Sequence, residues 1–229
     1  MNLTSEPWGS IEPSDLLDPI GLLTDEHDRQ LALGEALTRL ADEPQGEGVA
    51  KTAEAILGYL ERRLPLHVAA EIEDFYPLLQ GRAEYSDEFE QFLVAMREEH
   101  DADGTIAQEL AEPLRAIASG KPPPDAGQFQ TLVRRFTALQ RRHLLWENQT
   151  ILGLARKRLE PEDLARIGWK LAARYGVPHP EAARAQAADS QASSPAANRA
   201  ASAPDGKRKS AGETAFGRLT SRVFGRKKK

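Results

Sequence analysis

The 229-residue sequence contains no cysteine. Disulfide bonds, iron–sulfur clusters, thiolate zinc sites and cysteine nucleophiles are therefore excluded, and any metal must be bound by nitrogen and oxygen ligands. Aromatic residues make up only 6% of the chain, and β-branched residues are sparse, which disfavours a β-sheet. No apolar run approaches the roughly 20 residues that a transmembrane helix needs, and no basic segment leads into an apolar one near the N-terminus. We therefore expect a cytoplasmic protein.

The residues that are abundant favour helices. Ala, Leu, Glu, Arg and Gln are frequent, and the straight-chain residues among them lose little rotamer freedom in a helix. Apolar residues at helical spacing predict four long helices and a short fifth one. We expect Pro65 to bend the second helix and Ser86 to cap the third. Long helices joined by short loops predict an all-α, antiparallel up-down-up-down four-helix bundle. The expected helices cover about residues 16–41, 49–79, 87–117, 125–159 and 161–175.

The composition changes after Gly176. The segment from there onwards is rich in Ala, Ser, Pro and Gln, and it has too few large apolar residues to offset the entropy of ordering. We therefore predict an N-terminal extension at 1–14, a bundle domain at 15–176 and a disordered linker with a basic tail at 177–229. From residue 177 onwards there are eleven Lys or Arg and four Asp or Glu, a balance of +7, which leaves −12 for residues 1–176 of the total of −5.

The last residues of the chain, Phe216 to Lys229, form the basic amphipathic part of this tail. Its apolar residues recur at helical spacing among arginines and lysines. Such a segment is typical of contact with an anionic membrane, a protein partner or nucleic acid. A solvated basic terminus is the alternative.

Four of the five histidines are predicted to face the interior of the bundle, one from each long helix. They are His27, His67, His100 and His143. A Leu-rich interior offers an imidazole no hydrogen-bond partner, so four of them there need a common explanation. The first and third helices share the string Glu-His-Asp, and 73 residues separate His27 from His100 while 76 separate His67 from His143. This repetition predicts a site with pseudo-twofold symmetry.

Two of these histidines are followed four residues later by a glutamate on the same helix face, Glu71 after His67 and Glu147 after His143. Buried carboxylates are costly unless they bind metal or are paired, and no Lys or Arg lies on the same stripes. We therefore predict two metal ions, each bound by two imidazoles and bridged by both glutamates, with an oxo or hydroxo bridge and an open position for a small ligand. Such ligands suit iron, although manganese, zinc or a mixed pair fits the same ligand types.

Other residues beside the histidines are not expected to be ligands, because adjacent helical positions point about 100° apart. These residues are Glu26, Asp28, Glu99 and Asp101. Tyr59, Tyr76 and Trp146 are interpreted as core residues or as the lining of an access path.

The order His, His-x-x-x-Glu, His, His-x-x-x-Glu on successive helices resembles the hemerythrin-like (HHE cation-binding) domain family. The resemblance covers roughly Asp15 to Leu159, about two-thirds of the chain. It implies a diiron four-helix bundle used for oxygen binding, gas or redox sensing, iron handling or protection against peroxide or nitrosative stress. The oxygen-carrying branch has a second histidine one turn from that of its third helix, where this chain has Met96 and Gly104. That branch also ends its fourth-helix motif with aspartate, where this chain has Glu147.

Three functions follow from this pattern. The first is a non-haem diiron protein that binds or senses dioxygen, nitric oxide or peroxide at the open metal position. The second is a redox enzyme that degrades peroxide or nitric oxide, and the third is an iron storage or handling protein. The residues leave the choice between binding and turnover open, since no proton shuttle is evident beyond the ligands.

Overall fold

A computed structural model describes residues 8–182, 184 and 185 of the chain. All regular structure within these residues is helical, without a strand, which confirms the all-α prediction. No helix among them is both long enough and apolar enough to cross a membrane.

The first long helix, α1 (Pro19–Asp42), follows a short 3₁₀ turn, η2 (Pro13–Leu17). It begins where the Asp18 side chain accepts a hydrogen bond from the Gly21 N–H at 3.0 Å. A carboxylate at this position satisfies one of the free N–H groups of the first turn, and a proline at the first helical position needs no partner for its nitrogen.

The second long segment is one continuous helical run interrupted by two wider π-helical turns. It comprises α2 (Val49–Gly58), η3 (Tyr59–Arg63), α3 (Leu64–Ala69), η4 (Ala70–Phe75) and α4 (Tyr76–Gln80). Each π turn lies just before a proline, Pro65 or Pro77. Proline has no N–H to donate to the preceding turn, so a change of hydrogen-bonding pattern at these points has a local cause.

The third segment is α5 (Phe89–Ala118), preceded by the 3₁₀ turn η5 (Tyr85–Asp87). The prediction that Ser86 caps this helix is wrong, because Ser86 lies within η5. The cap is Glu88, in a left-handed conformation with φ of 51°.

The fourth segment comprises α6 (Ala126–Trp146), η6 (Glu147–Ile151) and α7 (Leu152–Arg158), where η6 is a third π-helical turn. Asp125 caps it and accepts a hydrogen bond from the Gln128 N–H at 2.8 Å. The predicted fifth helix is present as α8 (Pro161–Tyr175).

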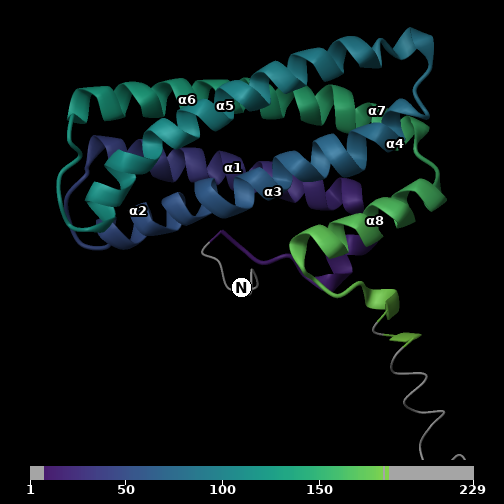
Figure 1. The fold of residues 1–229 in the computed structure, drawn as a ribbon, viewed down its shortest axis with the longest axis horizontal. Helices are drawn as coiled ribbons and strands as arrows, with labels where there is room; N and C mark the ends of the chain where they lie inside the picture. The colour runs from purple at the N-terminus through teal and green to yellow at the C-terminus, as the bar shows by residue number, and fades with distance from the viewer. Residues whose placement is uncertain (1–7, 183, 186–229) are drawn as a thin grey trace, which may run out of the picture. The chain divides into compact units, whose positions relative to one another are not determined.

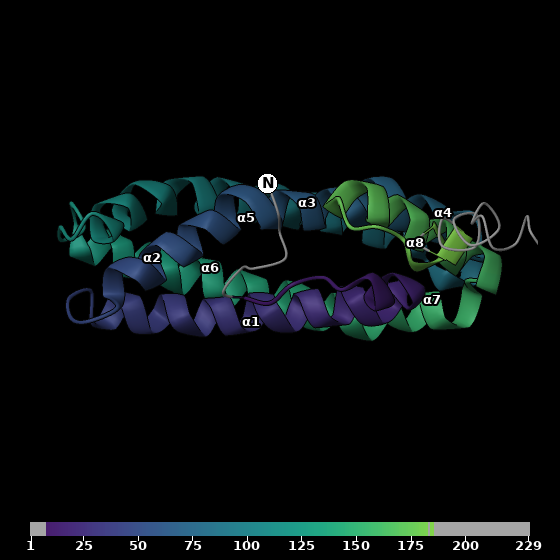
Figure 2. The ribbon, with the colours of Figure 1, turned by 90° about the horizontal axis from the view of Figure 1, so that it is seen from below.

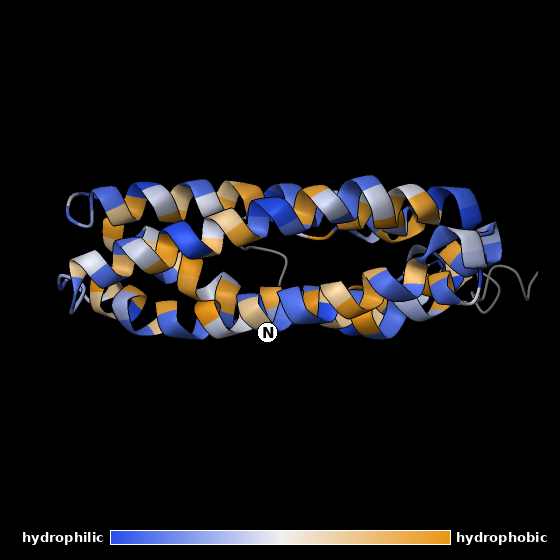
Figure 3. Cartoon of the chain, turned by 90° about the horizontal axis from the view of Figure 1, so that it is seen from above, coloured by the Kyte–Doolittle hydropathy of each residue, from blue (hydrophilic) through white to orange (hydrophobic). Residues whose placement is uncertain are grey.

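The four long segments form a helical bundle. The first packs against the second and the fourth, and the third packs against the same two (Figures 1 and 2). Apolar and polar bands alternate along the helices in Figure 3, as expected when one face of each helix is buried. Helix α8 packs against α1, η2 and η4.

The apolar core consists of two separate clusters, and the buried histidines lie between them. On α1, His27 stands between Leu23 of one cluster and Leu33 of the other. Helix α5 repeats this arrangement, with His100 between Met96 and Ile106. The bundle therefore places a polar layer between two apolar regions that exclude water.

Packed structure continues beyond residue 176. Val177 is buried in the core, and the His179 ring stacks on Trp169 with ring centroids 4.0 Å apart. Residue 183 and residues 186–229 of the predicted linker and tail, including the basic residues near the end of the chain, lie outside the described residues.

Candidate metal centre

All six residues that the sequence singled out are in the interior, and none is more than 7% exposed. They come from all four long segments: His27 from α1, His67 from α3, Glu71 from η4, His100 from α5, His143 from α6 and Glu147 from η6. The structure brings all six together in the polar layer.

Glu71 is the centre of this cluster. Its Oε1 lies 3.0 Å from His67 Nε2 and 3.2 Å from His27 Nε2. Its Oε2 lies 3.2 Å from His100 Nε2. One carboxylate therefore uses its two oxygens to face imidazoles from three helical segments.

Glu147 faces two imidazoles with a single oxygen. Its Oε2 lies 3.3 Å from His143 Nε2 and 3.4 Å from His27 Nε2. Each glutamate thus contacts the histidine one turn before it and a histidine from the other helical hairpin. This exchange of contacts agrees with the pseudo-twofold relation between the hairpins.

The imidazoles form two pairs. The ring centroids of His27 and His67 are 5.2 Å apart, and those of His100 and His143 are 4.7 Å apart. Ligand atoms of His27, His67 and Glu71 all lie within 4.8 Å of one another, the one such group of three or more found in the described part of the chain. The rings of the second pair are closer together, but among the described residues only the ligand atoms of the first pair and Glu71 meet this distance criterion.

The hydrogen-bonding state of the buried atoms tests whether these residues fit a metal. Glu71 Oε2, Glu147 Oε2 and His100 Nε2 are buried without a hydrogen-bond partner. Each nevertheless lies within 3.4 Å of an imidazole nitrogen or a carboxylate oxygen of this cluster. Close approach without hydrogen-bond alignment is expected when several lone pairs converge on a common point between them. Neutral imidazole nitrogens and carboxylate oxygens are also donors that transition metals prefer. The residues present therefore fit a metal.

Both glutamates lie at the beginning of a π-helical turn, Glu71 in η4 and Glu147 in η6. Isolated π turns within α-helices occur frequently at functional sites, since the wider turn redirects the side chains at that point. The spacing of four residues from each histidine is visible in the sequence. The wider turn that follows it is not.

The pKa shifts of His27 and Glu71 indicate that the site favours positive charge. Burial disfavours a protonated His27, yet the hydrogen bond to Glu71 and the charges of Glu147 and Glu71 raise the pKa of His27 to about 9. Burial likewise disfavours the ionised form of Glu71, but the charge of His67 and the surrounding imidazoles hold the pKa of Glu71 well below its ordinary value. The site therefore stabilises positive charge next to its carboxylates.

Two polar contacts orient the site from outside. His27 Nδ1 donates a hydrogen bond to Asn148 Oδ1 at 2.6 Å, which leaves Nε2 directed at the carboxylates. The Tyr76 hydroxyl donates a hydrogen bond to Glu147 Oε1. Sequence reasoning missed Asn148, although it directly follows a predicted ligand. It placed Tyr76 only in the core or along an access path.

The acidic neighbours of the histidines have different surroundings. Asp28 and Asp101 are exposed, whereas Glu26 is fully buried. Glu26 pairs with the equally buried Arg63, whose Nε and Nη2 donate to its two oxygens at 3.0 and 2.6 Å. Glu99 Oε2 lies 3.8 Å from His143 Nδ1, on the side of the ring away from Glu147. The close contacts of the histidine Nε2 atoms described above are with Glu71 and Glu147 and not with these four residues.

Asp103 also lies beside His143, with Oδ2 3.6 Å from His143 Nδ1, and it accepts a hydrogen bond from Gln140 Nε2 at 2.7 Å. Burial raises the pKa of Asp103 to about 6. The contact of Asp103 with Gln140, on a different helix, could not be read from either helix alone.

The sequence model of the family described as "Hemerythrin HHE cation binding domain" matches residues 18–155, which is more than half of the chain. No curated protein and no solved structure matches the chain significantly. The family match confirms the resemblance drawn from the histidine and glutamate pattern, and that pattern is gathered here into one buried cluster. The chain belongs to the hemerythrin HHE cation-binding family and is a metal-binding protein.

Proposed function

We propose that the chain binds two iron ions through its six buried histidine and glutamate residues and keeps an open coordination position for dioxygen, nitric oxide or peroxide. The ligands are His27, His67, Glu71, His100, His143 and Glu147. The observation that carries this proposal is that each glutamate contacts imidazoles of both hairpins. A carboxylate in that position can bridge two ions, whereas a single ion would not need both imidazole pairs.

The imidazoles and the carboxylates have different roles in binding the ions. Each pair of imidazoles supplies two neutral nitrogen donors to one ion, and the carboxylates supply the negative charge that offsets the cost of burying it. Asn148 fixes the His27 tautomer, and Tyr76 holds the Glu147 oxygen that does not face imidazoles. Two bound iron ions would supply a redox pair with room for a small exogenous ligand. The two apolar clusters on either side of the polar layer keep water away from the metal site.

Three further predictions from the sequence complete this proposal. The long segments run up-down-up-down, which the short loops between them favour. The bundle domain acts in the cytoplasm, and the basic tail provides contact with an anionic surface or a partner.

Iron loading of the full-length protein and of single-residue variants tests the proposal. We expect two iron ions per chain in the unmodified protein and a visible spectrum typical of a bridged diiron centre. Glu71→Gln should lose iron from both positions, because it removes the carboxylate charge shared by His27, His67 and His100. His179→Gln is the matched control, since His179 is buried outside the site and stacks on Trp169.

One ion per chain in the unmodified protein, or unchanged loading of Glu71→Gln, would contradict the proposal. Peroxide added to the loaded protein then separates binding from turnover. A spectral change without oxygen release indicates binding or sensing, and sustained oxygen release indicates an enzyme.

A further inference from the structure

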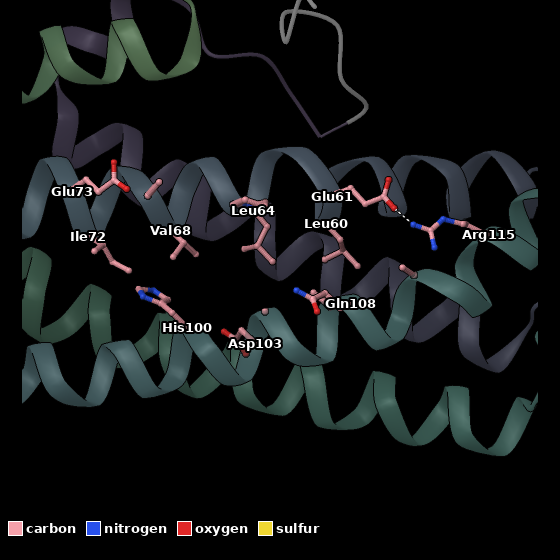
Figure 4. Close-up of a pocket in the computed structure, with 15 residues that line it drawn as sticks. Leu60, Glu61, Leu64, Val68, Ile72, Glu73, His100, Asp103, Gln108 and Arg115 are labelled. Carbon is pink, nitrogen blue, oxygen red and sulfur yellow. Dashed lines mark hydrogen bonds and ion pairs between the residues drawn. The ribbon is translucent and has the colours of Figure 1, made fainter.

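A pocket of about 630 Å³ lies beside the metal centre, between the second helical segment and α5 (Figure 4). Its walls are mainly apolar. They include Leu60, Leu64, Val68, Ile72, Ala107 and Ala111. His100 and Asp103 line the same pocket, and Figure 4 shows the His100 imidazole pointing from α5 toward Ile72 and Val68. The pocket therefore reaches a predicted metal ligand.

The size of this pocket does not match a diatomic ligand. A water molecule occupies about 30 Å³ in the liquid, and dioxygen or nitric oxide is of comparable size. Pockets of about 300–1,000 Å³ are typical of sites for small organic molecules. The volume therefore indicates a ligand with an organic body.

A glycine keeps the space next to His100 open. Gly104 lies one helical turn after His100, on the same face of α5. A Cβ atom added at Gly104 would meet no other atom within 4 Å. Because glycine has no side chain, this part of the pocket beside His100 stays unfilled.

The charges around the pocket are already compensated. Glu61 pairs with Arg115, and Glu73 pairs with Arg174, whose Nη2 lies 2.8 Å from Glu73 Oε2. An anionic guest would have to displace one of these acidic partners or lie against apolar walls without compensation, and it would be repelled by Asp103. The pocket is thus not complementary to an anion.

Polar atoms without partners are found where the pocket meets the metal centre. Asp103 Oδ1 and His100 Nδ1 are buried and have no hydrogen-bond partner, and both residues are more than nine-tenths buried. A guest with one polar end could satisfy them while its apolar body lies against the leucine and alanine side chains. An O–H group is suited to this position, because it can donate to a carboxylate.

We infer that this pocket binds an uncharged organic molecule that carries a hydroxyl group, with its apolar body between the second segment and α5 and its O–H group at His100 and Asp103. The O–H group lies on the Nδ1 side of His100, whose Nε2 faces Glu71, so this site is additional to the iron centre proposed above. It concerns binding only. Dioxygen and nitric oxide would leave most of the pocket unused.

Calorimetric titration of the full-length, iron-loaded protein with 2-phenylpropan-2-ol tests the inference. This alcohol is uncharged and combines an apolar aromatic body with one hydroxyl group. We expect a dissociation constant of about 1 mM or tighter for so small a molecule. Gly104→Leu should weaken binding at least about tenfold, because its side chain would occupy the pocket while its Cβ meets no atom within 4 Å.

Gly153→Leu is the matched control. Gly153 is also a helical glycine with no atom near its added Cβ, but it lies on α7, outside the pocket. Its binding should equal that of the unmodified protein. The anion 2-methyl-2-phenylpropanoate, of similar shape, should bind at least about tenfold more weakly than the alcohol.

The inference is overturned if the alcohol does not bind, if Gly104→Leu binds it as well as Gly153→Leu does, or if the anion binds more tightly. Iron content measured on the same samples separates the two proposals. Protein that takes up no iron but binds the alcohol in a Gly104-dependent manner would refute the iron centre and retain the pocket. Protein with two irons and no alcohol binding would refute only the pocket.

Discussion

The hydroxyl of Tyr76 offers a sharp test of how the second glutamate is held. Tyr76 is buried and donates to Glu147 Oε1, and burial together with the charge of Glu147 raises the pKa of Tyr76 well above its ordinary value. The hydroxyl therefore stays protonated and acts as a donor. Tyr76→Phe removes this donor and keeps the ring that packs against Phe75 and Phe89, with centroids 6.2 and 6.4 Å away.

A hydrogen bond to a charged group contributes about 1.5–3 kcal/mol when its loss leaves a buried partner unsatisfied. We expect the free energy of unfolding of the metal-free Tyr76→Phe protein to fall by about this amount, measured by urea denaturation. Tyr85→Phe is the control, because the Tyr85 side chain is fully exposed. Iron should still bind, since Glu147 faces the imidazoles with its other oxygen. A loss below about 0.5 kcal/mol would refute this account of Glu147.

Three other predictions concern the buried ion pair, the pH dependence and the tail. Arg63→Met should destabilise the protein by about 1.5–3 kcal/mol in urea denaturation, because it removes two hydrogen bonds to the buried Glu26 carboxylate and leaves Arg29 as its charged partner. The double variant with Glu26→Leu should regain a large part of this loss, and equal losses in both would contradict the pairing. The pKa of His27 is raised to about 9 in the folded protein. The stability that protonated His27 contributes to the metal-free protein is therefore complete below about pH 6.5 and is lost as the pH rises through 9. A free energy of unfolding that does not decrease over this range would contradict the carboxylate environment assigned to His27. Deletion of residues 207–229 should abolish binding to anionic liposomes, which co-sedimentation measures, and unchanged binding would reject a tethering role for the tail.

The sequence predicted the parts of this protein that depend on periodic patterns. Apolar spacing located the long helices, and the repeated His-x-x-x-Glu motif located Glu71 and Glu147 on inward faces. These predictions succeeded because a helix face is a local property with a fixed period. The prediction that Ser86 caps the third helix was wrong. The cap is Glu88, in a left-handed conformation that glutamate rarely adopts.

The contacts that orient the site were beyond sequence reasoning. The His27–Asn148 hydrogen bond joins residues 121 positions apart, and the Tyr76–Glu147 bond joins residues 71 apart. Neither Asn148 nor Tyr76 belongs to a repeated motif, so each contact exists only through the packing of different helices. The pairing of Glu26 with Arg63 has the same origin, and the π turns at both glutamates change the hydrogen-bonding pattern without changing the residue spacing.

The most direct measurement of the central claim is anomalous X-ray scattering at the iron absorption edge from crystals of the iron-loaded protein. We predict two anomalous peaks, one beside the His27 and His67 imidazoles and the other beside those of His100 and His143, with Glu71 between them. A single peak, or peaks away from these four rings, would contradict a two-iron centre.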